Sequence, residues 1–311
     1  MPVQGTGLSL TGIRGEFFNA LGQAQTYWQD LCTRIPSTTE TERYRFLGAV
    51  PQVREWGQGR LAKGIRSESY DVTNQKYEAT IEVDRDEIDD DQLGQIRLRL
   101  GELAATAAFH KDYLIEQLLL NGESAGFNSY DGVPFFNAAH QSGASGAQSN
   151  LLTYNATDAD NPTAAEFRMG MRQAIAKMVA YTDDVGQPRR IMPNPAGFVA
   201  VVPPTMMFTA LEALDMALVT NVESVFKVNV IQAAARVIAL PGLTDVSKWY
   251  LLKTDVPIRP FILQDRMPLE FTALENNSET GFKSEKFFYG VRARYAMTYG
   301  YWCYAICTDF T

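Results

Sequence analysis

Carboxylates gather in one short stretch of this chain, at Glu82, Asp84, Asp86, Glu87, Asp89, Asp90 and Asp91. Neighbouring carboxylates can serve acid–base catalysis or bind a hard cation. The run has no glycine where a calcium loop needs its sharp turn, and it is contiguous, whereas an enzyme site draws convergent polar groups from separate elements. We therefore interpret Asp84–Asp91 as a solvated junction before a helix whose dipole it complements. A soluble hydrolase that uses these carboxylates is the alternative from another functional class.

The remaining reactive side chains do not form a recognisable catalytic or metal-binding pattern. Cys303 and Cys307 lie in a stretch with strand periodicity, where an offset of four residues separates them by about 13 Å, too far for a disulfide. The two histidines, His110 and His140, lack a His-x3-His or Ser/His/Asp setting, so we expect both to be structural. We accordingly predict no catalytic residue, no cofactor and no metal ion.

The charge balance limits the partners. Asp and Glu number 36 against 28 Lys and Arg, which gives a formal net charge of −8. Such a chain is not suited to tight binding of nucleic acid or of an anionic membrane, although it could still enclose DNA. No apolar run is long enough to span a membrane, and Met1–Leu21 lacks the features of a signal peptide, so we expect a cytosolic protein.

One long helix organises the chain. The spacing of apolar and bulky residues predicts it over 91–121, with a buried stripe of alternating three- and four-residue steps. We expect the acidic run to mark its start and Asn121-Gly122 to end it in a left-handed conformation. The stripe consists of Leu93, Ile96, Leu100, Leu103, Ala107, His110, Leu114 and Leu118.

Weaker patterns surround this helix. Thr11–Leu31 predicts an N-terminal helix that contains several glycines and needs an external surface to hold it. Gln52–Val83 is glycine-punctuated and then alternating, and we interpret it as a protruding two-stranded excursion. An amphipathic helix over Thr163–Tyr181 and a buried strand at Phe198–Val202 predict an α/β region. Finally, period two persists over Tyr289–Cys307, with a bend expected at Gly300.

Several short strings, taken in chain order, carry a resemblance to a known family. They are Pro36-Ser37-Thr38-Thr39, Arg54-Glu55-Trp56, Ile88-Asp89-Asp90-Asp91, Tyr130-Asp131-Gly132 with Phe135-Phe136, Val202-Pro203-Pro204, Gln264-Asp265-Arg266, Tyr289-Gly290-Val291-Arg292-Ala293-Arg294-Tyr295 and Tyr299-Gly300-Tyr301-Trp302. Their order over nearly the whole chain resembles the major head subunit of Mu-like tailed phages.

The resemblance implies an α+β chain with the Hong Kong 97-type capsid fold. On that plan the chain would divide into an N-terminal arm (1–51), an extended β-hairpin loop (52–83), a peripheral domain with the long "spine" helix (84–162), an axial domain (163–269) and a return to the peripheral β-sheet (270–311). Lys63 would lie in the extended loop, but no partner Asn or catalytic Glu matches a motif, so covalent cross-linking is not carried over.

The function implied is that of a major capsid protein, which is not an enzyme and which assembles with itself. Copies would form the pentamers and hexamers of an icosahedral head around double-stranded DNA, in the virion, after assembly in the bacterial cytoplasm. No charged helical segment precedes Thr11, so a separate scaffold is expected, with a portal and possibly decoration proteins. A cargo-enclosing bacterial shell of the same fold is the alternative. The assembly-interface residues that we predict are Phe17, Trp28, Arg54, Glu55, Trp56, Arg60 and Lys63.

Overall fold

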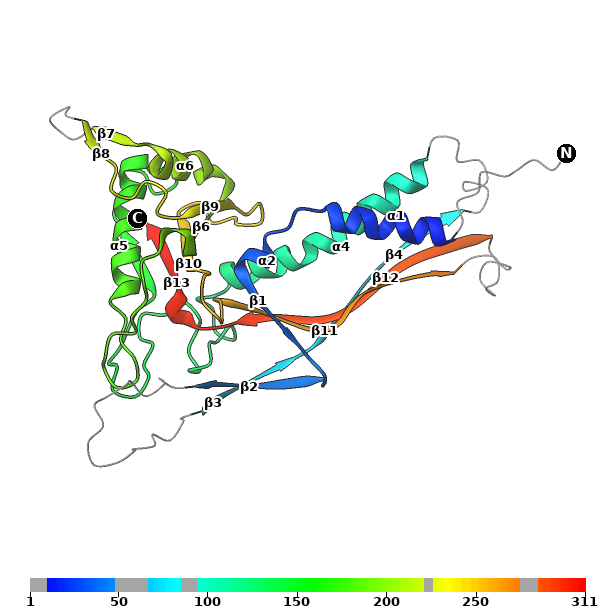
Figure 1. Ribbon diagram of the computed structural model, residues 1–311, viewed down its shortest axis with the longest axis horizontal. Coiled ribbons are helices and arrows are strands. Elements are labelled where there is room, and N and C mark those ends of the chain that lie inside the picture. The colour runs from blue at the N-terminus through cyan, green and yellow to red at the C-terminus, as the bar shows by residue number, and fades with distance from the viewer. Residues whose placement is uncertain (1–9, 48–66, 85–93, 221–225, 275–284) are drawn as a thin grey trace.

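The computed structural model describes residues 10–47, 67–84, 94–220, 226–274 and 285–311. These residues form an elongated part and a more compact part, which meet at the C-terminal end of the long helix (Figure 1). The helices are α1 Leu10–Gln23, α2 Trp28–Leu31, α4 Gln95–Leu120, α5 Ala164–Val179 and α6 Met207–Asp215, and single 3₁₀ turns cover Pro195–Gly197, Pro204–Met206 and Trp302–Tyr304. The strands are β1 Cys32–Pro36, β2 Thr41–Leu47, β3 Ser67–Thr73, β4 Gln75–Asp84, β5 Leu151–Tyr154, β6 Phe198–Val202, β7 Leu218–Thr220, β8 Phe226–Val228, β9 Arg236–Ala239, β10 Lys248–Lys253, β11 Phe261–Leu274, β12 Lys286–Tyr299 and β13 Ala305–Phe310.

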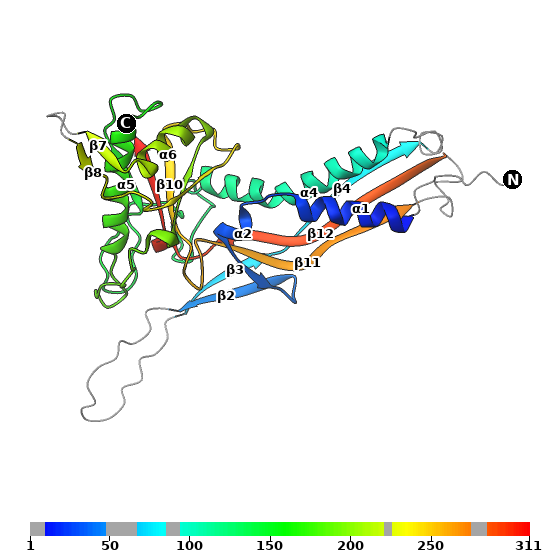
Figure 2. The same cartoon turned by 45° about the horizontal axis from the view of Figure 1, so that its top comes forward.

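The elongated part is a long sheet with two helices along it. Its strand order is β1-β11-β12-β4, with β1 parallel to β11 and the other neighbours antiparallel. Helices α1 and α4 lie side by side over this sheet (Figures 1 and 2). Alternate strand residues and the inner faces of both helices bury one apolar cluster between these layers. Its members are Ile13, Phe17, Val83, Ile96, Leu100, Leu103, Ala104, Phe271, Phe287, Tyr289 and Val291.

The compact part is built on a second sheet, of order β5-β13-β10-β6-β9. Strand β6 is buried at every position, as its uninterrupted apolar run predicts. Helix α5 begins with a capping box, in which Thr163 and Glu166 bond each other's backbone amides. Burial opposes ionisation of Glu166, but hydrogen bonds from Thr163 and Thr157 outweigh it and lower its pKa to about 2. The sheet therefore has a firmly fixed helix packed against it.

The long helix differs from the prediction at both ends. It begins at Gln95, because Gly94 before it has a left-handed φ of 68° that a continuous helix cannot contain. At the other end Asn121 has a φ of −98°, so the predicted left-handed stop is wrong, and its side-chain amide instead donates to the Gln117 carbonyl at 2.8 Å.

The structure buries most of the predicted stripe of this helix. Ile96, Leu100, Leu103 and Leu118 are buried, and Ala107 and Leu114 are partly buried against apolar clusters. Leu93 lies outside the described residues. Ala104, Ile115 and Leu119 are also buried, so the stripe is wider than predicted.

The N-terminal helix is broken in two. Helix α1 ends at Gln23 and the single turn α2 starts at Trp28, where the prediction ran one helix from Thr11 to Leu31. The cause is distant in sequence: Asp112 accepts hydrogen bonds from the backbone amides of Tyr27 and Trp28 at 3.1 and 2.8 Å. A carboxylate at that position starts a new helix.

The sheets cross the predicted domain boundaries. The N-terminal stretch supplies β1 to the long sheet and β2 to a separate hairpin with β3, so the hairpin begins before residue 52. Strand β11 belongs wholly to the long sheet, so the predicted boundary at residue 269 falls inside one strand.

The C-terminal stretch also divides between the sheets. The predicted single strand over Tyr289–Cys307 ends at Tyr299, and β13 then enters the compact sheet beside β10 and β5. Gly300 makes the change possible, because a Cβ there would lie 2.1 Å from the Arg259 carbonyl oxygen.

Candidate functional site

The hairpin of β2 and β3 stands apart from both main sheets, as Figure 2 shows. Arg43 and Asp71 pair across it at 2.7 Å. Side-chain hydrogen bonds join it to the long sheet: Tyr44 donates to Gln264 at 2.8 Å, Gln264 donates to the Val72 carbonyl at 3.2 Å, and Thr298 donates to the Tyr70 hydroxyl at 2.9 Å. The hairpin is thus fixed to the long sheet at its middle, where Tyr44 pairs with Tyr70, and near its start.

A charged turn fixes the direction in which the hairpin leaves the body. Glu42 accepts hydrogen bonds from the backbone amides of Thr39 and Thr38 and from the Ser37 hydroxyl, at 2.9, 2.8 and 2.9 Å. These bonds lower the pKa of Glu42 to about 2. Buried Asn74, where β3 passes into β4, donates to Ser37 at 2.9 Å from the other side.

Two buried carboxylates on α4 position the elements around the helix. Asp112 holds the start of α2, as described above, and Glu116 accepts from the backbone amide of Gly242 at 2.9 Å. Burial raises the pKa of Asp112, although the hydrogen bonds from Tyr27 and Trp28 lower it. One turn of α4 therefore carries the contacts to both the N-terminal segment and the compact part.

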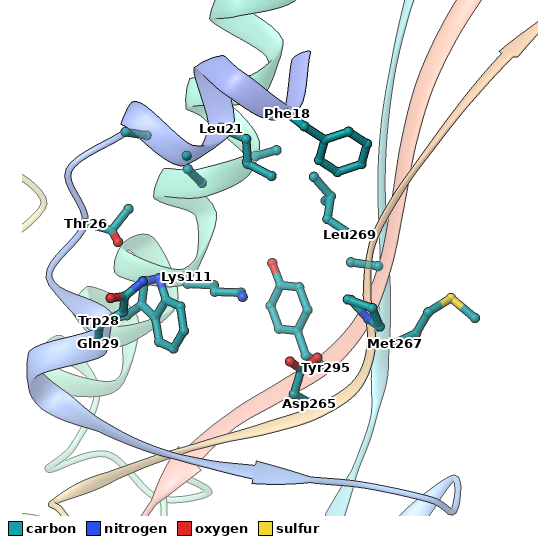
Figure 3. Close-up of a pocket in the computed structure, with 16 residues that line it drawn as sticks. Phe18, Leu21, Thr26, Trp28, Gln29, Lys111, Asp265, Met267, Leu269 and Tyr295 are labelled. Atoms are coloured by element: carbon teal, nitrogen blue, oxygen red, sulfur yellow. The ribbon is translucent and has the colours of Figure 1, made fainter. Parts of the chain in front are cut away.

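A cavity of about 310 Å³ opens between the N-terminal helices, α4 and the long sheet. Its apolar walls include Phe18, Leu21 and Leu269, and Figure 3 shows the Lys111 side chain extending between Trp28 and Tyr295. The Lys111 ammonium lies 4.4 Å from the centre of the Trp28 ring and 5.3 Å from that of Tyr295. Asp265 also lines the cavity, and its carboxylate is paired with Arg34, so the cavity combines apolar walls with the Lys111 ammonium and a carboxylate that already has a partner.

The predicted interface residues fall into three groups. The Phe17 ring is fully buried in its own chain, against Phe271 at 4.9 Å, and its role in an interface stays a prediction. Trp28 is half-buried beside Lys111, and its assembly role stays a prediction. The other predicted interface residues lie outside the described part of the chain: Arg54, Glu55, Trp56, Arg60 and Lys63.

The described residues of the acidic run and His140 make contacts that stabilise the fold. Within the acidic run only 82–84 are described, and Glu82 forms an ion pair with Lys286. His140 is buried, stacks on Trp302 at 4.2 Å, and lies 2.6 Å from an oxygen of Asp131 through its Nδ1. Over the described ranges no group of His, Cys, Asp and Glu is arranged to hold a metal ion.

The other described candidates are also packed inside the chain. His110 Nδ1 lies 2.6 Å from the Tyr295 hydroxyl. All three cysteines, Cys32, Cys303 and Cys307, are buried and free, and burial raises the pKa of each thiol. Raised thiol pKa values are the reverse of what a nucleophilic cysteine requires.

Sequence reasoning missed an exposed apolar surface in the compact part. Phe208 of α6 and Val230 are each 77% exposed, and Met216 and Val228 nearby are also exposed. Pro203 and Pro204 indicate the start of this helix, but the spacing of apolar residues in it does not distinguish a buried face from an exposed one. Lys111 was missed for a similar reason, since it sits beside the stripe residues and its neighbours come from distant segments.

Comparison with known proteins decides the family. Residues 8–167 and 242–310 match the family model described as Mu-like prophage major head subunit gpT, which is more than half of the chain. The chain belongs to this family of Mu-like major head subunits. It is 24% identical over 94% of its length to the Mu-like prophage FluMu major head subunit of Haemophilus influenzae, of which the match covers 68%. It is 30% identical to the major capsid protein of Escherichia phage Mu over 42% of each chain.

The fold of the chain is also similar to those of solved phage capsid proteins, in agreement with the family match. The procapsid protein of bacteriophage JBD30 matches with a TM-score of 0.57 and 24% identity, over 97% of this chain and 73% of that one. This Mu-like head subunit thus has the predicted α+β capsid fold of the Hong Kong 97 type, and its place is the virion capsid. It is a structural protein that assembles with itself, so the hydrolase alternative is wrong, and the family favours a phage head over a cargo shell. None of its described helices is long and apolar enough to cross a membrane.

Proposed function

We propose that copies of this chain form the pentamers and hexamers of a closed icosahedral head around double-stranded DNA. The observation that carries the proposal is the distribution of uncovered apolar side chains over separate faces. Phe208, Val228 and Val230 lie in the compact part, whereas Phe109 and Tyr113 lie on the outer side of α4. A single dimer face would gather such residues in one patch, but a shell needs several moderate contacts with different neighbours.

The parts of the chain would divide this work as the capsid fold implies. The compact part would act as the axial domain near the symmetry axes, and the long sheet with α1 and α4 would act as the peripheral domain. The hairpin of β2 and β3 would lead into the extended loop with its interface residues, Arg54, Glu55, Trp56, Arg60 and Lys63. A separate scaffold and a portal would join the head in the host cytoplasm, and decoration proteins could be added to its surface.

Electron microscopy with analytical sedimentation tests the proposal. The purified chain is concentrated over a range of salt, alone and with a candidate scaffold protein, and the products are imaged. Closed particles of uniform size are expected, built from rings of five and six subunits. A chain that stays monomeric or dimeric under all these conditions would contradict the proposal.

A further inference from the structure

The cavity beside Lys111 has an imbalance of charge. Burial lowers the pKa of Lys111, while the nearby Asp265 raises it and Arg34 lowers it. Asp265 is already engaged, because its Oδ2 accepts from Arg34 at 2.6 Å. Among the described residues none accepts a hydrogen bond from the Lys111 ammonium, which can donate three. The cavity thus presents a positive charge held between two aromatic rings, without a carboxylate bound to it.

These features define the chemistry of an occupant. A carboxylate is the natural partner of an ammonium in a partly desolvated site, where the pair is stronger than in water. The remaining walls include polar Thr26 and Gln29, but Phe18, Leu21 and Leu269 form an apolar part that would accept a branched aliphatic side chain (Figure 3). The site therefore fits a short acidic peptide with an aliphatic residue in it.

The chain itself contains such a peptide. The acidic run 84–91 reads DRDEIDDD, with Ile88 between carboxylates on both sides. Since the proposed head is built from copies of one chain, every subunit in it would bring an acidic segment of that composition. The cavity and the segment are complementary in both charge and apolar content.

Chain geometry prevents the segment from reaching the cavity of its own subunit. Lys111 is seventeen residues along α4 from Gly94, or about 26 Å at 1.5 Å per residue. The ten residue steps from Asp84 to Gly94 extend over about 36 Å at most. If the segment ran from Asp84 to Lys111 and back to Gly94, the return to Gly94 would use about 26 Å of this length. That leaves about 10 Å for the distance from Asp84 to Lys111. Asp84 pairs with Lys286 of β12, whereas the Tyr295 ring beside Lys111 lies nine residues further along that strand, or about 30 Å, so the distance from Asp84 to Lys111 exceeds what the segment can span.

We infer that the cavity between α1, α4 and the long sheet binds the acidic segment 84–91 of a neighbouring subunit, with Lys111 as the carboxylate-binding residue. The inference rests on the proposed head assembly, and it names one contact that the assembly uses. The Trp28 and Tyr295 rings orient the ammonium, and the apolar walls receive Ile88.

A peptide titration tests the cavity directly. The full-length chain, kept below its assembly concentration, is titrated calorimetrically with a synthetic peptide of residues 84–92, and with a matched peptide in which Asn and Gln replace Asp and Glu. The acidic peptide should bind at least tenfold more tightly than the neutral one, and this preference should weaken as salt is raised. Lys111→Met, which keeps the aliphatic stem against Trp28, should abolish the preference. Equal binding of the two peptides to the wild-type chain, or an unchanged preference in Lys111→Met, would overturn the inference.

A charge exchange tests the contact in assembly. Lys111→Glu should reduce particle yield, and the same chain with Asp89→Lys and Asp90→Lys added should recover it, because each altered cavity then meets an altered segment of its neighbour. Wild-type yield with Lys111→Glu alone would overturn the inference. Loss of yield without recovery by the exchange would also overturn it and would point to an acidic partner other than a second copy. If the wild-type chain binds the acidic peptide but forms no particles under any condition, the proposed function fails while the cavity's specificity stands.

Discussion

Phe17→Ala distinguishes a core residue from an interface residue. The Phe17 ring is fully buried, with Phe271 4.9 Å away between ring centres, and it lies in the cluster shared by α1, α4 and the long sheet. Truncation of a buried Phe to Ala costs about 3–5 kcal/mol through lost burial and the cavity left behind. Helix α1 has little with which to offset that loss, because Gly15 and Gly22 each cost about 1 kcal/mol relative to Ala and an isolated helix of its length is marginal in water.

We therefore expect α1 to detach while the compact part stays folded. The expected fold-change is large, since 3 kcal/mol corresponds to a change of about 150-fold in the opening equilibrium. Hydrogen exchange resolved by peptide should show lost protection over 10–23 and unchanged protection in β6 and β10. The matched control is Phe18→Ala, because Phe18 is the next residue, is 37% exposed and has Arg14 over its ring. Its removal should alter protection only slightly.

The result that would refute this reasoning is specific. If Phe17→Ala keeps wild-type protection over α1 but fails to form particles, the ring acts between subunits. In that case the buried position described here is not the one that matters in the head. If Phe17→Ala and Phe18→Ala lose hydrogen-exchange protection over α1 equally, burial of the Phe17 ring is not what holds the helix in place.

Four further predictions concern separate parts of the chain. Trp56→Ala should leave the subunit folded by circular dichroism and lower particle yield, because a large aromatic in a glycine-rich stretch suits an interface; Trp249→Ala, which removes a fully buried ring, should instead unfold the chain. Leu103→Asp should prevent folding, since an unpaired carboxylate in an apolar cluster costs several kcal/mol, against a typical total of about 5–15 kcal/mol. Soluble Leu103→Asp protein with a cooperative thermal transition would contradict this. Glu166→Gln should cost about 1 kcal/mol at pH 7. Because the folded pKa is lowered from 4.5 to about 2, the contribution is complete above pH 4.5 and is lost as the pH falls toward 2, where thermal melts of the two proteins should converge. Purified subunits or empty particles should bind duplex DNA weakly near physiological salt, because the chain carries a net charge of −8. Submicromolar affinity with a steep salt dependence in a filter or fluorescence assay would contradict that expectation.

The sequence predicted the long helix but not its start. Alternation of three and four residues is a local property, and α4 buries apolar residues with this spacing in its first part, up to Ala104, and in its last part, from Ile115. The start depends on the backbone of Gly94, which adopts a left-handed φ that no periodicity reveals. The carboxylates at 89–91 predict a start at Asp91, because acidic residues stabilise a helix N-terminus whether they lie in its first turn or just before it.

The C-terminal stretch shows a different limit. Alternate residues are buried along most of β12, whereas β13 is buried at five of its six positions, on both faces. The alternation in the sequence continues from one strand into the next, so it alone cannot tell one strand from two. The division is set by Gly300, whose amide donates to the Pro260 carbonyl at 2.7 Å and whose Cα passes close to Arg259. Both neighbours are about forty residues away in sequence, and only the folded chain brings them together. The same holds for the cavity, whose walls come from four distant segments.

The apolar stripe on α4 predicts that the helix is buried, but two carboxylates determine which segments of the chain bind to it. Asp112 and Glu116 are one turn apart, and each binds a backbone amide of a different part of the chain. A Cβ at Gly242 would lie 2.0 Å from a Glu116 oxygen, so that contact admits only glycine without displacement. Apolar contacts tolerate small sliding, whereas hydrogen bonds to buried carboxylates have fixed partners and are costly to leave unmade. The N-terminal segment and the compact part are therefore held in register on a single helical turn. A subunit built in this way can meet several neighbours with surfaces whose relative positions are set inside its own chain.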